Sequence, residues 1–286
     1  MLQVSIILVN YNTKDLLANC LKSIYEQSFG IQFEIIVVDN ASTDGSEEHI
    51  KILFPNVIWI NSCTNLGFGR ANNLGASKAT GEYLFMLNSD TILKNNAIAM
   101  FLEYMQKYEN QHLGIIGGYL RDSHGNINFS YGTFPSAAQE FRYIVNKIFG
   151  DKVSVATRSV DFVSGADMFM KRELFNLIGG FDPNIFMYYE ETDLQYRLHD
   201  AGYVQKIIEG PDIIHFEGGS EIKNFTYNRF IMSQKSYNYY IKKHFYNLNY
   251  LFMRVTLILL RLSLFITTDW SFKEKVSAYK LTLLGK

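Results

Sequence analysis

The chain has 286 residues, 48% of them hydrophobic, which is enough to bury a substantial core in one large domain or two small ones. Lys and Arg number 27 against 28 Asp and Glu, so the net charge of −1 excludes a bulk electrostatic attraction to nucleic acid, and we expect no nucleic-acid partner. The two cysteines, Cys20 and Cys63, give neither a disulfide framework nor a metal-ligand spacing.

The N-terminus has the composition of a β-strand. It lacks the basic start and the small-residue cleavage site of a secretory signal peptide. Together with the scarcity of cysteine, this predicts a cytoplasmic protein in a reducing compartment.

The first part of the chain alternates short apolar runs with segments of helical periodicity. The apolar runs, each typical of a buried strand, cover Val4 to Val9, Phe33 to Val38, Val57 to Ile60 and Tyr83 to Leu87. Strands that alternate with helices imply right-handed crossovers, so we expect an α/β fold with a Rossmann-like, mixed but mainly parallel sheet flanked by helices. The four strand ends then share one edge, where open α/β sheets bind their ligands.

Polar residues follow each of these four strands. They are Asn10 and Asn12 after the first, Asp39 after the second, Asn65 and Arg70 after the third, and Asn88, Ser89 and Asp90 after the fourth. Singly, each is explained as a turn or capping residue. Together on one edge they favour a binding site, and the oxygens of Asn88 and Asp90 suit a divalent cation.

The next part of the chain departs from strict alternation. Gly114 to Leu120 and Ile127 to Phe129 are predicted to form a hairpin with its turn near His124. A helix is expected over Ala137 to Phe149, in a segment that could be a mobile lid or an acceptor loop, and the pattern does not choose between the two.

A further strand is predicted over Val160 to Phe169. Its small residues Gly165 and Ala166 would allow a ligand or a second backbone to come close. Farther along, His215 stands at another strand end, where a packed or capping histidine is the default interpretation and a metal ligand the minority one.

Two adjacent glutamates, Glu190 and Glu191, follow an aromatic cluster. Thr192 and Gln195 form a capping-box pattern, which predicts a helix beginning at Thr192 with the glutamates just before it. Asp44 and Glu47 show the same pattern before an earlier helix. Burial would raise the pKa of the two glutamates and the helix dipole would lower it, so the sequence leaves the sign open. Exposed acids favoured by the dipole alone are an equally good interpretation.

Six segments in a fixed order resemble the family 2 glycosyltransferases of the GT-A fold. They are residues 4–12, 38–45, 65–73, 88–90, 179–182 and 190–194. The resemblance implies a GT-A catalytic domain over 1–220, with a nucleotide-binding half over about 1–120 and an acceptor half over about 121–220. A helical, aromatic-rich C-terminal extension over 221–286 would follow.

The resemblance also implies roles for the residues of the edge. Asp39 would contact the nucleotide base, and Asn88-Ser89-Asp90 is similar to the family's Asp-x-Asp metal motif, with Asn in place of the first acid. Asp90 would therefore be the principal ligand of Mg2+ or Mn2+, with Asn88 weaker and His215 an additional ligand. The implied nucleotide-binding residues are Val9, Asn10, Tyr11, Asp39, Asn65, Arg70, Asn88 and Ser89, and the acceptor-side residues are Gly165, Ala166 and Glu190.

Glu191 fills the position of the family's catalytic base, which is usually an aspartate. The implied reaction is metal-dependent, inverting transfer from a nucleoside-diphosphate sugar, in which Glu191 removes the acceptor hydroxyl's proton. The sequence looks most like bacterial rhamnosyltransferases, which implies dTDP-L-rhamnose as donor and a saccharide or polyprenyl-linked saccharide of surface polysaccharide as acceptor. The alternative is an inactive nucleotide-sugar or glycan-binding GT-A module in a polysaccharide assembly complex.

The C-terminal stretch, residues 225–286, is rich in Tyr, Phe and Leu. Leu251 to Ile266 is very apolar, but Arg254 and Arg261 interrupt it, which predicts that it does not cross a membrane. An interfacial helix, peripheral on the inner face of the plasma membrane, and a helix packed on the catalytic domain or in a homodimer are equally good interpretations.

Overall fold

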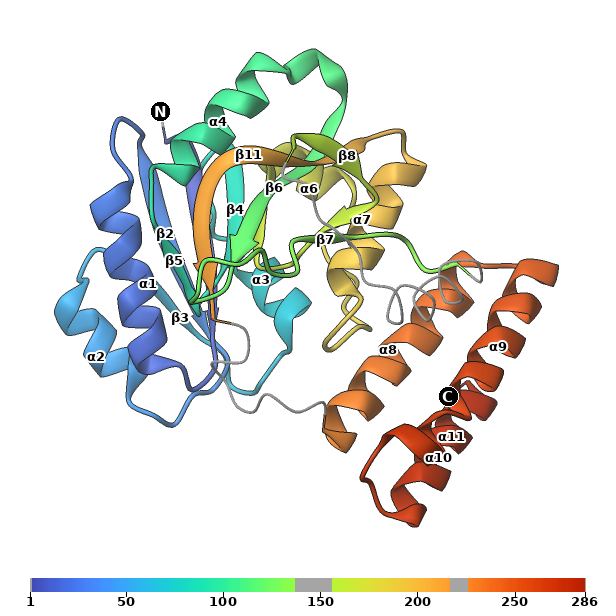
Figure 1. Ribbon diagram of the computed structural model, residues 1–286. Coiled ribbons are helices and arrows are strands. Elements are labelled where there is room, and N and C mark those ends of the chain that lie inside the picture. Colours follow the sequence, from blue (N-terminus) through green and yellow to red (C-terminus); the bar gives the residue numbers. More distant parts are fainter. Residues whose placement is uncertain (1, 137–155, 217–225, 286) are drawn as a thin grey trace.

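The computed structural model describes residues 2–136, 156–216 and 226–285 (Figure 1). The helix expected over Ala137 to Phe149 lies outside the described residues.

A mixed sheet forms the centre of the molecule, in the strand order β3-β2-β1-β4-β10-β6-β11-β5, with β8 paired to β11. Its strands are β1 Val4–Asn10, β2 Phe33–Asp39, β3 Ile58–Asn61, β4 Tyr83–Asn88, β5 Thr91–Leu93, β6 Leu113–Arg121, β8 Arg158–Val160, β10 Asp167–Lys171 and β11 Val204–His215. The four strands predicted from the apolar runs are parallel neighbours, as expected, and their carboxyl ends meet on one edge.

Helices cover both faces of this sheet (Figure 1). On one face lie α1 Lys14–Gln27, α2 Ser46–Leu53 and α4 Ala97–Lys107, and on the other lie α3 Phe68–Ala76, α6 Arg172–Leu177 and α7 Glu190–Asp200. Strand β1 shows why: Ile6 and Leu8 pack into one core cluster, whereas Ile7 between them packs into the other. A strand covered on both sides has no polar alternation, which is why it reads as a continuous apolar run. The expected α/β class is confirmed.

Strand β10 lies in the middle of the sheet and runs against both neighbours. It pairs antiparallel with β4 through Asp167↔Leu87 to Lys171↔Tyr83, and with β6 through Phe169↔Ile116. The strand predicted over Val160 to Phe169, interrupted at residues 164–166, is two separate strands that divide at that interruption. Its first half is β9 Phe162–Val163, which pairs with β7 Tyr131–Gly132 in a separate two-stranded sheet.

Three local predictions, one hairpin and two capping boxes, need correction. The turn near His124 exists, with the Gly125 amide donating to the Asp122 carbonyl at 3.0 Å, but the hairpin beyond it is reduced to one bridge between Arg121 and Ile127. β6 pairs instead with β10 and β11.

Neither predicted capping box forms. Helix α2 begins after Gly45, and Asp44 accepts from the Lys14 amide at 2.9 Å while Glu47 binds Lys51. Helix α7 begins at Glu190, two residues before the predicted start, and the Gln195 side chain binds the Val163 amide and carbonyl in place of a helix cap. In both segments tertiary contacts provide the side chains with partners that a local pattern does not show.

Four helices form the C-terminal region: α8 Tyr227–His244, α9 Asn247–Arg261, α10 Leu264–Thr267 and α11 Phe272–Leu284. Helix α8 packs on α7 through aromatic residues, and α9 lies on the side of α8 away from the sheet (Figure 1). The stretch Leu248–Thr267, with mean hydropathy 1.7, is long and apolar enough to cross a membrane by length and composition. The expectation that the arginines leave no stretch of spanning length is therefore wrong, whereas the expectation that the stretch does not cross a membrane stays a prediction.

Candidate active site

A chain of hydrogen bonds joins three of the predicted strand ends at the carboxyl edge. The buried amide of Asn10 donates to Asp39 Oδ1 at 2.7 Å, and Asn10 Oδ1 accepts from the Thr13 hydroxyl at 2.7 Å. Thr13 in turn lies 3.1 Å from the Ser89 hydroxyl. β1, β2 and the end of β4 are thus tied together by polar side chains, which confirms that these residues share one edge.

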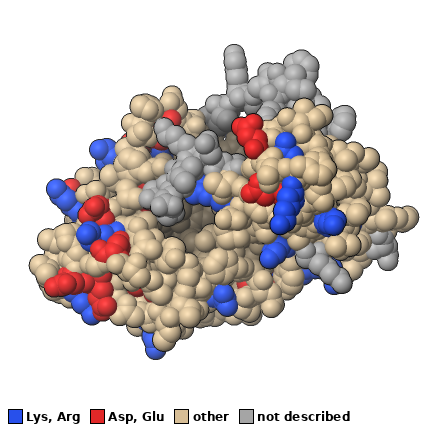
Figure 2. Space-filling model, turned by 90° about the horizontal axis from the view of Figure 1, so that it is seen from below, with Lys and Arg blue, Asp and Glu red and all other residues tan. Residues whose placement is uncertain are grey.

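Asp39 is held rigidly within this chain of bonds. Its second oxygen accepts from the Ser42 amide at 3.0 Å, and it lines a pocket of about 690 Å³ together with the first turn of α2. Val9 is partly buried next to it, whereas Tyr11 is 44% exposed just beyond the end of β1. Figure 2 looks onto this face of the molecule and shows that it is hollowed near its middle.

Asn88, Asp90 and His215 meet where β4 and β11 end. His215 Nε2 lies 3.3 Å from Asp90 Oδ1 and 3.3 Å from the Asn88 amide nitrogen. Strand β11 brings His215 opposite Thr91, and the Phe216 amide donates to the Asp90 carbonyl at 3.0 Å. The other ring nitrogen of His215 is buried and has no hydrogen-bond partner among the described residues.

This trio fits a divalent cation, for which two neighbouring ligands of an octahedral ion stand about 3 Å apart. The carboxylate oxygen and ring nitrogen already have that separation, and the Asn88 side chain offers an amide oxygen once its two ends are exchanged. No group of three or more His, Cys, Asp and Glu side chains that could hold a metal occurs within 2–136, 156–216 and 226–285. The trio would thus offer a cation one carboxylate, one imidazole and one side-chain amide.

Gly165 and Ala166 connect this trio to the glutamate pair. The backbone N–H of Asn88 donates to the Ala166 carbonyl at 2.9 Å, so the end of β4 lies against the 164–166 segment. A Cβ placed on Gly165 would lie 3.5 Å from the Phe68 ring and 3.7 Å from the Cβ of Glu191, which is ordinary van der Waals contact. The side chains of Phe68 and Glu191 thus border this segment, and the approach of a ligand to Gly165 and Ala166 stays a prediction.

The backbone before the glutamates is strained. Tyr188 and Tyr189 both adopt φ of +67°, a left-handed conformation that is unfavourable for bulky residues. These two turns begin α7 at Glu190. Glycine or asparagine at these positions would have indicated a left-handed turn, but both residues are tyrosine. The sequence pattern therefore missed the helix start by two residues.

The structure gives the direction of the pKa shift of the two glutamates, which the sequence left open. Glu190 is buried, with one carboxylate oxygen unpaired among the described residues; desolvation and then the neighbouring Glu191 charge hold the pKa of Glu190 well above its usual value. Desolvation also raises the pKa of Glu191, although backbone amides at the start of α7 partly offset it. The more exposed Glu191 is the accessible member of the pair, whereas Glu190 packs under Gly69.

The segment from Asn65 to Asn73 is clamped onto the segment that precedes the glutamates. The Asn73 side chain donates to the Phe181 carbonyl at 2.8 Å and accepts from the Phe181 amide at 2.9 Å. Gly67 has φ of +78°, and a Cβ there would overlap the Phe186 carbonyl oxygen. Asn65 accepts from the Gly67 amide at 2.9 Å, so its side chain shapes this loop.

Arg70 is bonded to the loop that precedes its own helix, α3. Its Nε donates to the Leu66 carbonyl at 2.7 Å, and its guanidinium lies 6.0 Å from the Phe186 ring centre. No contact between Arg70 and the metal trio is found within the described parts of the chain.

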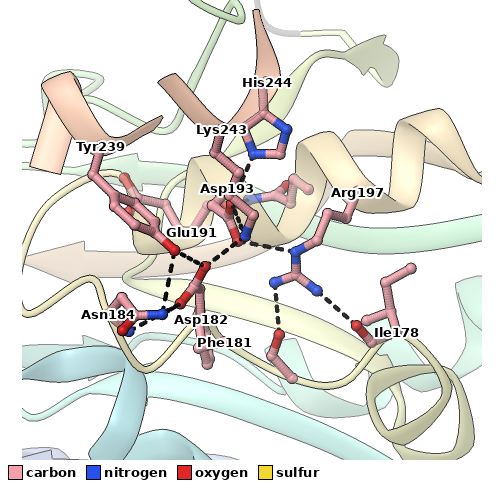
Figure 3. A network of polar contacts seen from close by, with 12 residues as sticks. Ile178, Phe181, Asp182, Asn184, Glu191, Asp193, Arg197, Tyr239, Lys243 and His244 are labelled. Atoms are coloured by element: carbon pink, nitrogen blue, oxygen red, sulfur yellow. Dashed lines mark hydrogen bonds and ion pairs between the residues drawn. The ribbon is translucent and has the colours of Figure 1, made fainter. Parts of the chain in front are cut away.

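A network that the sequence reasoning missed fixes α8 to α7 (Figure 3). Lys243 lies 2.6 Å from Asp182 and 2.7 Å from Asp193, and His244 lies 2.7 Å from Asp193. Burial alone would raise the pKa of Asp182, but hydrogen bonds from Lys243, the Asn184 amide and Tyr239 lower it to about 2. Asp182 and Asp193 belong to segments 179–182 and 190–194, which resemble the family. Nothing in their spacing showed that both bind one lysine of the C-terminal region.

The polar strand ends, the Asp–His pair and the buried glutamate pair lie at the carboxyl edge of an open α/β sheet, where such sheets bind ligands. The Glycosyl transferase family 2 model matches residues 5–179, more than half of the chain. The chain belongs to this family and is a glycosyltransferase.

Relatives by sequence include two bacterial enzymes. The chain is 26% identical over 208 residues to N-acetylglucosaminyl-diphospho-decaprenol L-rhamnosyltransferase of Mycobacterium tuberculosis, covering 65% of this chain and 67% of that protein. It is 32% identical over 180 residues to glycosyltransferase GlyG of Streptococcus pneumoniae, covering 60% of this chain and 58% of the relative. The chain thus spans little more than half of GlyG.

Two solved structures share the fold. GalNAc-T7 with UDP, GalNAc and Mn2+ superposes with a TM-score of 0.68 at 16% identity, over 99% of this chain and 56% of that one. The mannosyltransferase PcManGT of Pyrobaculum calidifontis, in complex with GDP-Man and Mn2+, gives a TM-score of 0.58 at 20% identity, over 96% and 73%. These likenesses establish the GT-A fold.

Proposed function

We propose that the chain catalyses metal-dependent, inverting transfer of a sugar from a nucleoside diphosphate to a saccharide or polyprenyl-linked saccharide. The observation that carries this proposal is the row from the Asp90–His215 pair through Asn88 and the Gly165–Ala166 segment to Glu191. A cation held by the pair would lie near a carboxylate on the edge where open α/β sheets bind ligands.

Asp90, His215 and Asn88 would hold Mg2+ or Mn2+, which supplies positive charge against the leaving diphosphate. The nucleotide would lie along Val9, Asn10, Tyr11, Asp39 and the Asn65–Arg70 loop, with Ser89 next to its phosphates. The two neighbours solved with Mn2+ support the divalent ion.

Glu191 would remove the proton from the acceptor hydroxyl. Glu190 is the more buried carboxyl, and desolvation followed by the charge of Glu191 holds its pKa well above the usual range, so the more exposed Glu191 would serve as the base. Gly165 and Ala166 would leave room for the acceptor.

The first donor to test is dTDP-L-rhamnose, since relatives of this chain are named as rhamnosyltransferases. An acceptor like the decaprenol-linked one named for the mycobacterial relative would place the reaction at the cytoplasmic face of the plasma membrane.

The test is a panel of nucleotide sugars with Mn2+ or Mg2+ and a polyprenyl-diphosphate acceptor, followed by product analysis. Glu191→Gln should lower the transfer rate by about 10² to 10⁴ and leave nucleoside diphosphate binding intact. Asp90→Ala should remove the gain in nucleotide affinity that Mn2+ confers. Exposed Glu103 lies on α4, so Glu103→Gln is the matched control and should behave as the unaltered chain.

Unchanged transfer in both site variants would refute the assigned roles. Nucleotide binding without transfer or hydrolysis for any donor would instead make the chain a binding module.

A further inference from the structure

In helix α9 the arginines are at least partly buried and many large apolar side chains are exposed, the reverse of the usual pattern in a water-soluble protein. Its arginines point into the C-terminal bundle: Arg254 is 7% exposed and donates to Asn238 at 3.0 Å and to the Thr282 and Leu283 carbonyls at the end of α11. Arg261 donates to Gln234 at 3.1 Å and lies 5.4 Å from the Phe230 ring centre.

The exposed face of the same stretch is mainly apolar, with the uncharged polar residues Asn249, Ser263 and Thr267 also exposed. Its large exposed side chains recur at helical spacing and are between 46% and 88% exposed: Leu248, Leu251, Phe252, Val255, Leu259, Leu262 and Ile266. We call these seven residues the apolar stripe. No acidic or basic side chain is exposed among the described residues between 248 and 268. Helix α9 alone has 15 residues and extends about 22 Å, so the stripe is larger than scattered surface leucines would explain.

The exposed charge of the described C-terminal helices is mostly positive. The exposed charged residues of the four C-terminal helices and their connections are Lys235, Lys242, Lys273 and Lys280 against Asp269. In a symmetric pair of chains this excess would face its own copy, whereas an anionic lipid surface complements it.

We propose that the apolar stripe binds an anionic phospholipid bilayer, with α9 and α10 lying in the plane of the membrane surface. The bonds of Arg254 and Arg261 to α8 and α11 oppose a transmembrane orientation, because insertion would break them and carry two charges into the hydrocarbon. This inference goes beyond the transfer reaction: it names the surface by which the enzyme reaches a lipid-linked substrate.

The test is flotation of the full chain with phosphatidylglycerol-containing vesicles and with phosphatidylcholine vesicles. The chain should float with the anionic vesicles and be released by alkaline carbonate, as an interfacial helix is and a membrane span is not. Leu251→Glu with Leu259→Glu changes two side chains that are 58% and 60% exposed, and should lower the vesicle partition coefficient at least about tenfold.

The matched control is Leu177→Glu, since Leu177 is 75% exposed on α6, away from the stripe. It should float like the unaltered chain. Nucleotide affinity and thermal unfolding should be the same in all variants, which separates failure of this proposal from failure of the proposed function.

Three results would overturn the proposal. Equal flotation of the double variant and the unaltered chain would show that the stripe is not the contact. Retention after carbonate treatment would show a span. A dimer in light scattering that the double variant converts to monomer, without vesicle binding by either, would assign the stripe to a second copy.

Discussion

Glu191 is a carboxylate whose surroundings set its protonation. The pKa of Glu191 is raised from 4.5 because α7 and the 164–166 segment desolvate it. A base must be ionised to accept a proton, so transfer should fail as the pH falls through this raised pKa. We predict that the acid limb of kcat/KM against pH has its midpoint above 4.5.

The measurement is initial rate from pH 4 to 9 at saturating Mn2+, with circular dichroism to confirm that the chain stays folded. Glu191→Gln should show only residual activity without this limb. A midpoint at or below 4.5 in the unaltered chain would remove Glu191 as the base.

For single residues, the sequence predicted which side chains share the carboxyl edge, but not the contacts that they make there. Asn10, Asp39, Ser89 and Asp90 do come to one edge because parallel strands place their ends there. The start of α7 could not be found in this way, since two left-handed tyrosines produce it and tyrosine does not favour that conformation.

Among the elements, the loop before α3 and the segment before α7 behave as one unit. Gly67 is required there twice over, by its φ of +78° and by the closeness of the Phe186 carbonyl. Gly45 has nearly the same φ, +77°, but open space around it, and is therefore the matched control.

We predict that Gly45→Ala costs about 1 kcal/mol of unfolding free energy and Gly67→Ala at least about 2 kcal/mol, with a loss of transfer rate only in the latter. Urea unfolding and initial rates measure both. Equal effects of the two substitutions would mean that the contact with Phe186 does not matter.

At the scale of the whole molecule, ion pairs of Lys243 join the C-terminal helices to the sheet domain. The pKa of Asp182 is about 2 in the folded chain and 3.8 for the ordinary group, so its contribution to stability is complete above 3.8 and is lost as the pH falls through 2. The bonds to Lys243 are the largest lowering cause. Lys243→Met should therefore destabilise the chain by about 2 to 4 kcal/mol at pH 7 and by much less near pH 2.

Urea unfolding at the two pH values measures this difference. Lys242→Met, at the exposed neighbouring position, is the control and should change stability little at either pH. A cost for Lys243→Met that does not depend on pH would show that the lysine acts through packing of its alkyl chain.

The order of elements in the sequence does not predict that of the sheet. The βα alternation predicted β1 to β4 because right-handed crossovers make successive strands parallel members of one sheet, although β1 and β4 pair across about 80 residues. The position of β10, antiparallel between β4 and β6, departs from this alternation, and no local pattern in the sequence records it.

That position of β10 has a consequence during synthesis. The ribosome delivers β1 to β4 well before Asp167–Lys171, so until then β4 is an edge strand whose backbone and apolar run Tyr83–Leu87 await a partner. The nascent chain therefore passes through an interval in which pairing with another strand competes with the native one. Conditions that slow elongation between residues 90 and 170 should lower the yield of soluble protein without changing the stability of molecules that have already folded.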